Sequence, residues 1–146
     1  MLKKNKQLII ITIIFLNFAN SLFASENFYK NAIEKYNKKN FEDAKFLFQR
    51  NIIFNPRDAK SYLYLAKIYN NEENQKEELK NINTVILLDP KNEEAVYMLI
   101  KIDLKKSNYL EVKKLLKTFL VICNNLCEKE KLILEALNNI EPKNES

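Results

Sequence analysis

The chain has 146 residues, 24 of them basic and 19 acidic, and contains neither histidine nor glycine. This length fits a single domain. The missing glycine excludes the glycine-rich loops that cradle phosphate, and the missing histidine removes the most frequent general base and a frequent metal ligand. The composition therefore argues against an enzyme, a cofactor and a metal site.

The start of the chain has the pattern of a secretory signal peptide. Residues 1–7 carry three lysines and no acid, residues 8–18 form an apolar run, and a short polar-to-small stretch ends at Ala24. A basic start, an apolar run of about 7–15 residues and a small residue at the end describe such a leader. We therefore expect 1–24 to be a signal peptide and residues 25–146 to be exported to the periplasm or cell envelope.

An uncleaved anchor is the alternative for this segment. Residues 8–23 would then be the membrane span, although they are shorter than the roughly 20 apolar residues that cross a bilayer. The rest of the chain would be held at the inner membrane and would still lie outside the cytoplasm.

Removing the leader changes the charge of the chain. Residues 25–146 retain 21 basic and 19 acidic side chains, which is a net charge of +2. The high pI comes mostly from the leader, so it gives little support for nucleic-acid binding.

The rest of the sequence repeats with a period of 34 residues. Asn55-Pro56 and Asp89-Pro90 are separated by this interval, and so are Asn40, Asn74 and Asn108, each with an acidic residue three positions later. Proline disfavours helical geometry in the residue before it, and asparagine caps helix starts. A fixed period with the same punctuation in each copy indicates stacked copies of one supersecondary unit.

Each 34-residue window contains two amphipathic helices separated by a tight turn. The windows are 25–58, 59–92 and 93–126, and a further apolar stripe over 127–140 predicts a seventh helix that caps the stack. Residues 141–146 form a polar tail that we expect to be disordered. The sequence thus predicts an all-α helix-turn-helix solenoid of three helix pairs, with a domain over 25–140.

Cys123 and Cys127 are the only cysteines and lie in the turn at the end of the third window. In an exported chain such a pair indicates a disulfide, which would close a short ring between two helices. Free thiols are the alternative, and a metal site is not expected because it would need further ligands and the chain has no histidine.

The windows resemble tetratricopeptide repeats. The resemblance covers about residues 25–130 and departs from the family pattern where the turn glycine is Lys39, Glu73 or Ser107 and where Glu78 replaces a packing alanine. The matching positions are Phe28, Tyr62 and Val96, the small residues Ala32, Ala44 and Ala66, the aromatics Phe41 and Tyr109, and the two helix-ending prolines.

The resemblance implies a concave groove lined by the first helix of each pair, in which a protein or peptide partner binds. Tyrosines and lysines there suit an extended peptide with apolar side chains and an acidic group, while the alternatives are tyrosines that fill the core and lysines that are merely solvated. The expected groove residues are Tyr29, Ile33, Tyr36, Leu63, Tyr64, Lys67, Asn70, Tyr97, Lys101 and Lys105.

Lys101 and Lys105 only partly match the carboxylate clamp of the family, because Tyr29 and Ile33 stand at its first-repeat positions. We therefore do not expect recognition of a eukaryotic chaperone tail. Lysines around the third turn would allow contact with an anionic membrane surface, although a solvated face is the simpler interpretation. They are Lys105, Lys106, Lys113, Lys114 and Lys117.

The function that fits best is a non-enzymatic adaptor in the cell envelope that binds proteins or peptides. The alternative is an integral subunit of an envelope assembly complex, in which the repeats are docked permanently. Neither oligomeric state nor partner follows from these residues, because a fold alone does not confer a ligand.

Overall fold

The computed structural model describes residues 27–140, and these residues are helical, with no strand among them. The predicted all-α helix-turn-helix fold is confirmed. The predicted leader and tail lie outside the described residues, as does the alternative span over 8–23. Within 27–140, no helix combines the length and the apolar composition that a membrane crossing requires.

The chain divides into two compact units, Met1–Ile68 and Tyr69–Ser146. The boundary falls inside α3 (Ala59–Asn71), so this helix contributes to both units. Each unit is described by itself below.

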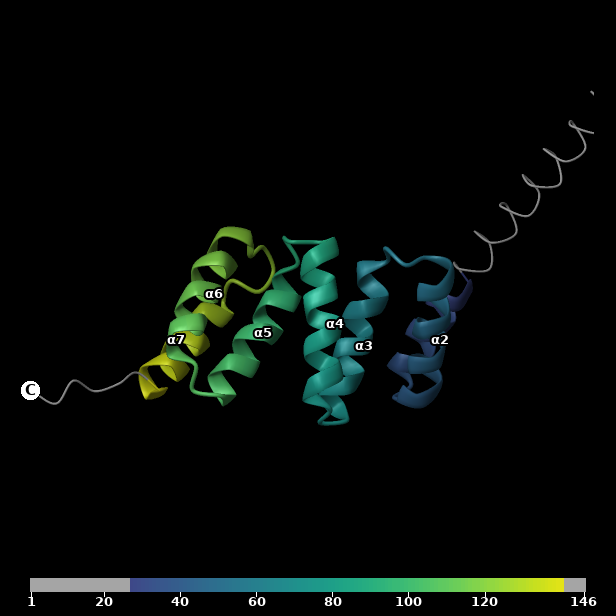
Figure 1. Ribbon diagram of the computed structural model, residues 1–146, viewed down its shortest axis with the longest axis horizontal. Helices are drawn as coiled ribbons and strands as arrows, with labels where there is room; N and C mark the ends of the chain where they lie inside the picture. Colours follow the sequence, from purple (N-terminus) through teal and green to yellow (C-terminus); the bar gives the residue numbers. More distant parts are fainter. Residues whose placement is uncertain (1–26, 141–146) are drawn as a thin grey trace, which may run out of the picture. The chain divides into compact units, whose positions relative to one another are not determined.

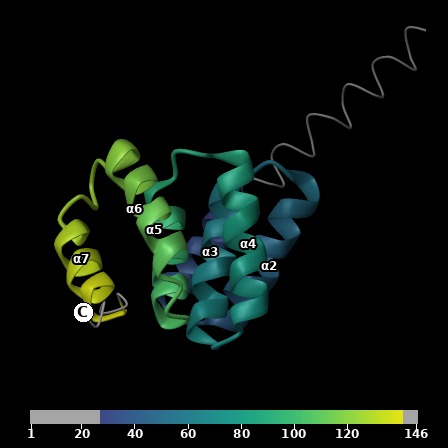
Figure 2. The same ribbon diagram turned by 60° about the vertical axis from the view of Figure 1, so that its left-hand side comes forward.

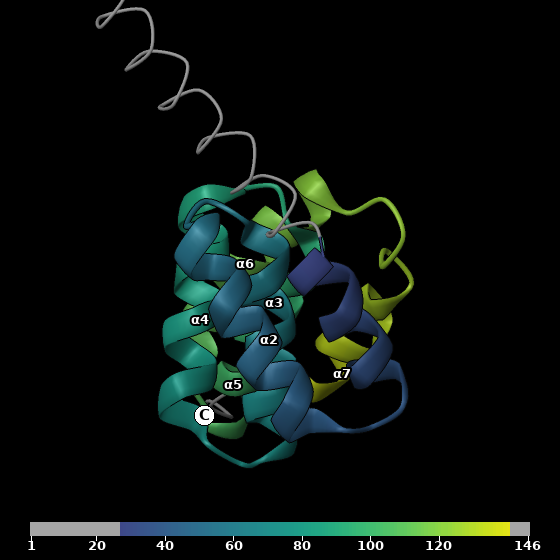
Figure 3. The same cartoon turned by 90° about the vertical axis from the view of Figure 1, so that its right-hand side faces the viewer.

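In the first unit, the helical residues 27–37 lie beside α2 (Phe41–Phe54), as Figure 3 shows, and α3 follows. The core of this unit includes Ala32, Ala44 and Phe48, which are fully buried. Two of these are alanines at positions that the repeat pattern reserves for small side chains. A small residue in each helix lets the two helices approach closely, and the large Phe48 fills the space that remains between them.

The second unit contains α4 (Gln75–Leu88), α5 (Glu93–Lys105), α6 (Tyr109–Ile122) and α7 (Lys129–Ile140). Helix α5 packs against α4 and α6, and α7 packs against α5 and α6 (Figures 1 and 2). Side chains from α5, α6 and α7 share one buried cluster. Its members are Val96, Ile100, Val112, Leu116, Phe119, Ile133 and Leu137.

The three turns between paired helices each contain a residue with a positive φ. These residues are Lys39 (φ 59°), Glu73 (φ 57°) and Ser107 (φ 52°), which stand where the repeat family has glycine. A residue with a Cβ atom is sterically disfavoured in this left-handed region. The turns therefore keep the geometry of the repeat although the sequence has no glycine to relieve the steric strain.

The asparagine after each of these turns ends one helix and begins the next. The N–H of Asn40 donates to the carbonyl of Lys35 at 2.9 Å, and the corresponding bonds of Asn74 and Asn108 have the same length, as in a Schellman motif. The side chains of Asn40 and Asn74 accept the N–H three residues on, which confirms the predicted caps. Asn108 makes no such cap bond, and its amide donates to the carboxylate of Asp103 at 3.2 Å.

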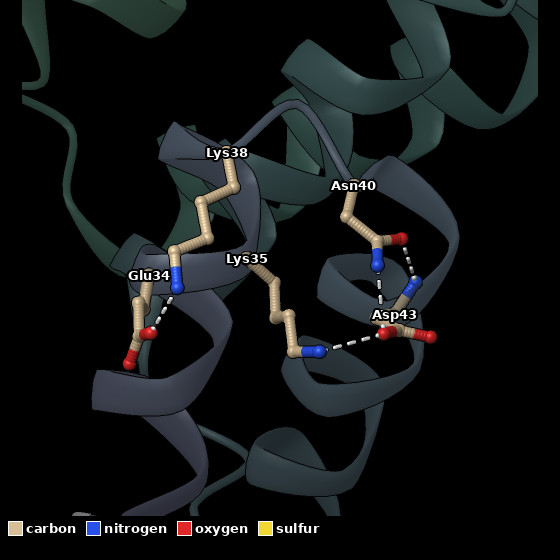
Figure 4. A network of polar contacts seen from close by, with 5 residues as sticks. All are labelled: Glu34, Lys35, Lys38, Asn40 and Asp43. Atoms are coloured by element: carbon tan, nitrogen blue, oxygen red, sulfur yellow. Dashed lines mark hydrogen bonds and ion pairs between the residues drawn. The ribbon is translucent and has the colours of Figure 1, made fainter.

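Ion pairs support the first turn from the outside (Figure 4). Lys35 donates to Asp43 at 2.9 Å across the turn, Lys38 donates to Glu34 at 2.6 Å, and the Asn40 amide also donates to Asp43 at 2.8 Å. The hydrogen bond from Lys35 lowers the pKa of Asp43, and the same bond raises the pKa of Lys35. All of these groups are at the surface, where solvent screening keeps such pairs weak.

A buried polar network joins α2 to the start of α3. The amide of Asn51 donates to Asp58 at 2.7 Å and to the hydroxyl of Ser61 at 2.9 Å, and Ser61 donates to Asp58 at 2.6 Å. One period later, Val85 and Ala95 stand at the positions of Asn51 and Ser61, and all four are buried. A buried polar pair at the junction of the first and second windows therefore corresponds to a buried apolar pair at the junction of the second and third.

Candidate functional site

Five aromatic rings meet in the first unit, and we call them the aromatic cluster: Tyr29, Tyr36, Phe41, Phe48 and Tyr64. The centroid of Tyr64 lies 4.9 Å from Tyr36 and 5.0 Å from Phe48, and it stacks nearly parallel to Phe48. Tyr29 contacts both Phe48 (6.0 Å) and Tyr64 (6.5 Å). Tyr64 is thus held in one orientation by rings on several sides.

The aromatic cluster is partly open to solvent. Phe48 is fully buried, whereas Tyr29, Tyr36 and Tyr64 are half-buried. Burial is the main cause that raises the pKa of Tyr29, and the nearby Tyr64 adds to it. The tyrosines therefore pack into the core with one part and present another part at the surface, which combines the two interpretations that the sequence left open.

Lys67 places a positive charge beside the aromatic cluster. Its Nζ lies 4.8 Å from the centroid of Tyr64, one helical turn earlier on α3. At this distance the ammonium is attracted by the electron-rich face of the ring. An aromatic surface with a cation at its edge can bind an apolar side chain and a carboxylate of the same segment.

Two other expected groove residues of this unit differ in how far they are exposed. Ile33 is half-buried, whereas Leu63 is only 8% exposed and presents little of its side chain to solvent. The buried residues of α3 include Leu65 and Ile68 as well as Leu63, and they are spread around most of the helix circumference. A single apolar stripe therefore underestimates how much of this helix is covered.

In the second unit, Tyr97 and Lys101 form a pair one turn apart on α5. Tyr97 is half-buried against Phe119, with centroids 6.1 Å apart, and the Nζ of Lys101 lies 5.8 Å from the centroid of Tyr97. The pair repeats the arrangement of Tyr64 and Lys67 with a weaker cation–ring contact.

Two more expected residues, Asn70 and Lys105, line one polar pocket in the second unit. The pocket has a volume of about 260 Å³ and is completed by Glu73, Gln75 and Glu78. Glu78 is 5% exposed and accepts a hydrogen bond from the Asn70 amide at 2.9 Å. The sequence pattern flagged Glu78 as an exception to the packing alanine, and the structure shows that Asn70 compensates for its burial.

The predicted disulfide joins Cys123 and Cys127, whose Cα atoms are 5.3 Å apart. Beside it lies a contact that the sequence did not reveal. The carboxylate of Glu93, at the start of α5, accepts the N–H groups of Asn124 (2.6 Å), Asn125 (3.0 Å) and Leu126 (3.2 Å). We call residues 123–127 with this carboxylate the clamped loop.

The clamped loop stabilises the charged form of Glu93. The hydrogen bond from the backbone of Asn124 is the largest cause that lowers the pKa of this carboxyl, and bonds from Asn125 and Leu126 add to it. The side-chain amide of Asn125 also donates, at 3.0 Å. The only sequence signal was an acid in the first turn of a helix, which suits the helix dipole and needs no distant partner.

The described residues hold no group of three or more metal-ligating side chains. No protein-family model and no curated protein matches the chain. Solved structures do resemble it. The type III secretion translocator chaperone SycD of Yersinia enterocolitica, in complex with a peptide of the translocator YopD, shares 19% identity at a TM-score of 0.66, over 79% of this chain and 90% of that one.

The fold is a tetratricopeptide-like helical repeat. The second TPR domain of human RPAP3, in complex with the HSP70 peptide SGPTIEEVD, has a TM-score of 0.66 at 18% identity, over 84% of this chain and 99% of that one. A chain of the CopN-Scc3 complex has a TM-score of 0.62 at 20% identity, over 80% of this chain and 69% of that one. At such identities the likeness establishes the fold alone.

Proposed function

We propose that the protein is a non-catalytic module that binds an extended peptide segment of a partner protein. The observation that carries the proposal is the aromatic cluster, in which half-buried tyrosines are held in place by the buried Phe48. Rigid aromatic side chains give a large contact area and lose little entropy on binding. The SycD and RPAP3 structures, each with a bound peptide, support this use of the fold.

The charge beside the cluster indicates what the peptide carries. Lys67 in the first unit and Lys101 in the second each lie over a tyrosine. A bound segment with an apolar side chain and an aspartate or glutamate nearby would contact both the ring and the ammonium, and the opposite charges would favour its association.

The test measures peptide affinity with the aromatic cluster intact and altered. Peptides would be selected on the protein from a random display library, and the best binder would be labelled for fluorescence anisotropy. We expect Tyr64→Ala to weaken its binding by about tenfold or more, as removal of a central aromatic anchor does. Lys67→Gln should weaken it by severalfold, and more for acidic peptides than for neutral ones.

Tyr62 provides the matched control, because it is a half-buried tyrosine of the same helix that lies outside the cluster and donates to the carbonyl of Pro56 at 3.3 Å. Tyr62→Ala should leave peptide affinity nearly unchanged. Melting curves followed by circular dichroism would show that each variant is folded. Equal losses for Tyr62→Ala and Tyr64→Ala, or selection of no peptide, would refute the proposal.

We further propose that the module acts outside the cytoplasm. The leader pattern of 1–24 supports this location, and so does the disulfide, since such bonds persist in oxidising compartments. Mass spectrometry of the protein purified from its own cells should find Ser25 as the first residue. Retention of Met1 in a membrane fraction would favour the anchored alternative.

A permanently docked subunit is the second candidate function. Several large apolar side chains are strongly exposed, among them Ile53 (75%), Leu87 (80%) and Val121 (84%). Exposed apolar surface of this kind is typical of proteins that are covered in an assembly. Aggregation of the purified chain in the absence of a partner would favour this candidate over the adaptor.

A further inference from the structure

Helices α6 and α7 enclose an apolar groove on the second unit. It has a volume of about 600 Å³, and its floor is formed by Leu116 and Leu137, which are 7% and 4% exposed. The leucines higher on its walls are more open, with exposed fractions of 77% for Leu110, 42% for Leu120 and 40% for Leu134. We call this set of five leucines the leucine groove.

The leucine groove lies where the helix pairing of the fold is incomplete. Helix α5 opens the third window and is covered by α6, which follows it (Figure 1). Helix α7 comes next and packs on α5 and α6, but within the described residues no further helix follows it (Figure 2). A helix laid in the groove would cover α7 as α6 covers α5.

Three lysines and no acidic residue line the leucine groove. Lys114 is paired with Glu111 at 3.1 Å, and Lys113 lies 4.2 Å from the centroid of Tyr109. The ammonium of Lys117 makes no hydrogen bond or ion pair with any described residue. A group that fills the groove is therefore favoured if it brings negative charge with it.

We propose that the leucine groove binds an acidic amphipathic helix of a partner protein. The leucine-rich side of that helix would fill the groove, and its carboxylates would face Lys113, Lys114 and Lys117. This mode of recognition lays the apolar side of a helix into an apolar groove and reads it at helical spacing. It uses a surface separate from the aromatic cluster and does not depend on peptide binding there.

The shape and charge favour this occupant over two others. A lipid bilayer would contact protruding side chains, whereas Leu116 and Leu137 lie at the bottom of a recess. A second copy of the chain offers no strongly acidic helix, because even α5, the most acidic of helices α2–α7, has three acidic residues against two lysines.

The experiment uses protein purified from cells that express the whole 146-residue chain. The probe is a fluorescein-labelled synthetic helix of about 18 residues, or five turns, with leucines on one side and glutamates on the other. Anisotropy should show saturable binding that weakens as salt is added. The same peptide with glutamine in place of every glutamate should bind about tenfold more weakly.

Variants of the groove test where the probe binds. Leu120→Gln and Leu134→Gln should each weaken binding by about tenfold, since each removes an apolar contact of a full side chain. Lys117→Gln should weaken it by severalfold and reduce the salt dependence. The matched controls are Leu87→Gln and Lys80→Gln on α4, which lie outside the groove and should leave binding unchanged.

Other outcomes would overturn the proposal. They are the absence of saturable binding, equal binding of the glutamine peptide, and an equal loss for Leu87→Gln and Leu120→Gln. Light scattering that reveals a dimer abolished by Leu120→Gln would assign the groove to a second copy. Binding to phosphatidylglycerol vesicles that is lost in Leu120→Gln, without peptide binding, would assign it to a membrane. Tyr64→Ala should leave binding to the leucine groove intact.

Discussion

Three of the residues that the structure describes adopt a backbone conformation that their side chains disfavour. Lys39, Glu73 and Ser107 all have φ between 52° and 59°. Each is the left-handed residue of a Schellman motif, whose next residue donates back to the preceding helix. The hydrogen bonds of the motif hold these residues in the left-handed conformation. Each of these three turns therefore carries the steric cost of a Cβ atom.

Replacing such a residue with glycine should stabilise the protein. We expect Ser107→Gly to raise the free energy of unfolding by about 0.5–1 kcal/mol, because relief of the left-handed strain exceeds the extra entropy that glycine gives the unfolded chain. Urea denaturation followed by circular dichroism would measure the change. Ser107→Ala is the matched control, since alanine keeps the Cβ atom and should bring no gain. A loss of stability in Ser107→Gly would contradict the strain argument.

Buried polar residues mark the limit of what the residue pattern could predict. The repeat pattern has small residues at Ala32 and Ala44, and both are fully buried, but Asn51, Ser61 and Asn81 are also buried. A polar side chain is buried only when its partners are in place, and those partners come from a different turn or helix. The position of Val85 one period after Asn51 was the one signal in the sequence that Asn51 faces inward.

At the scale of helices and turns, the residues that cap and end helices predicted more than the period of the apolar residues did. Asparagine caps and Asx-Pro stops act within a few residues, so they gave the start of α2 and the ends of α2 and α4. The burial of Leu63 was not predicted, because coverage of a helix depends on every neighbouring element, which no local pattern reports. The bond between Glu93 and the clamped loop was missed for the same reason, since it joins residues more than 30 positions apart.

The clamped loop should make stability depend on pH. The folded pKa of Glu93 is lowered, so its stabilising effect is complete well above the ordinary value of 4.5 and is lost as the pH falls through the folded pKa. We expect Glu93→Gln to lower the free energy of unfolding at pH 7 by about 1 kcal/mol, less than for a buried charged hydrogen bond because the group is at the surface. Between pH 4.5 and more acidic values the two proteins should converge.

Urea unfolding at a series of pH values would measure this difference. Glu135→Gln, an exposed glutamate of α7 outside the clamped loop, is the control and should follow the unaltered protein throughout. Reduction of the disulfide should also shrink the effect of Glu93→Gln, because the loop then has more conformations in which its N–H groups diverge. A difference that persists unchanged at acidic pH would show that the carboxylate charge is not the cause.

For the molecule as a whole, a stack of repeats can end only where another element covers the apolar face of the last repeat. In the second unit that cover is α7, which contributes Ile133 and Leu137 to the buried cluster at 1% and 4% exposure. Solenoids need a terminal element of this kind because each repeat buries its face only against a neighbour. Sequence alone indicated the cap, since the stripe over 127–140 continued after the last repeat.

Removal of α7 should therefore destabilise the second unit. We expect a chain that ends at Glu128, which keeps the disulfide and the clamped loop, to lose about 3–6 kcal/mol of stability from the missing burial of Ile133 and Leu137 alone. That loss approaches the whole stability of a typical small domain. Circular dichroism melting and light scattering should show early unfolding and association of this chain, whereas a chain that ends at Ile140 should behave like the full protein. Retention of the full melting temperature without α7 would mean that α5 and α6 are stable with their apolar face in water.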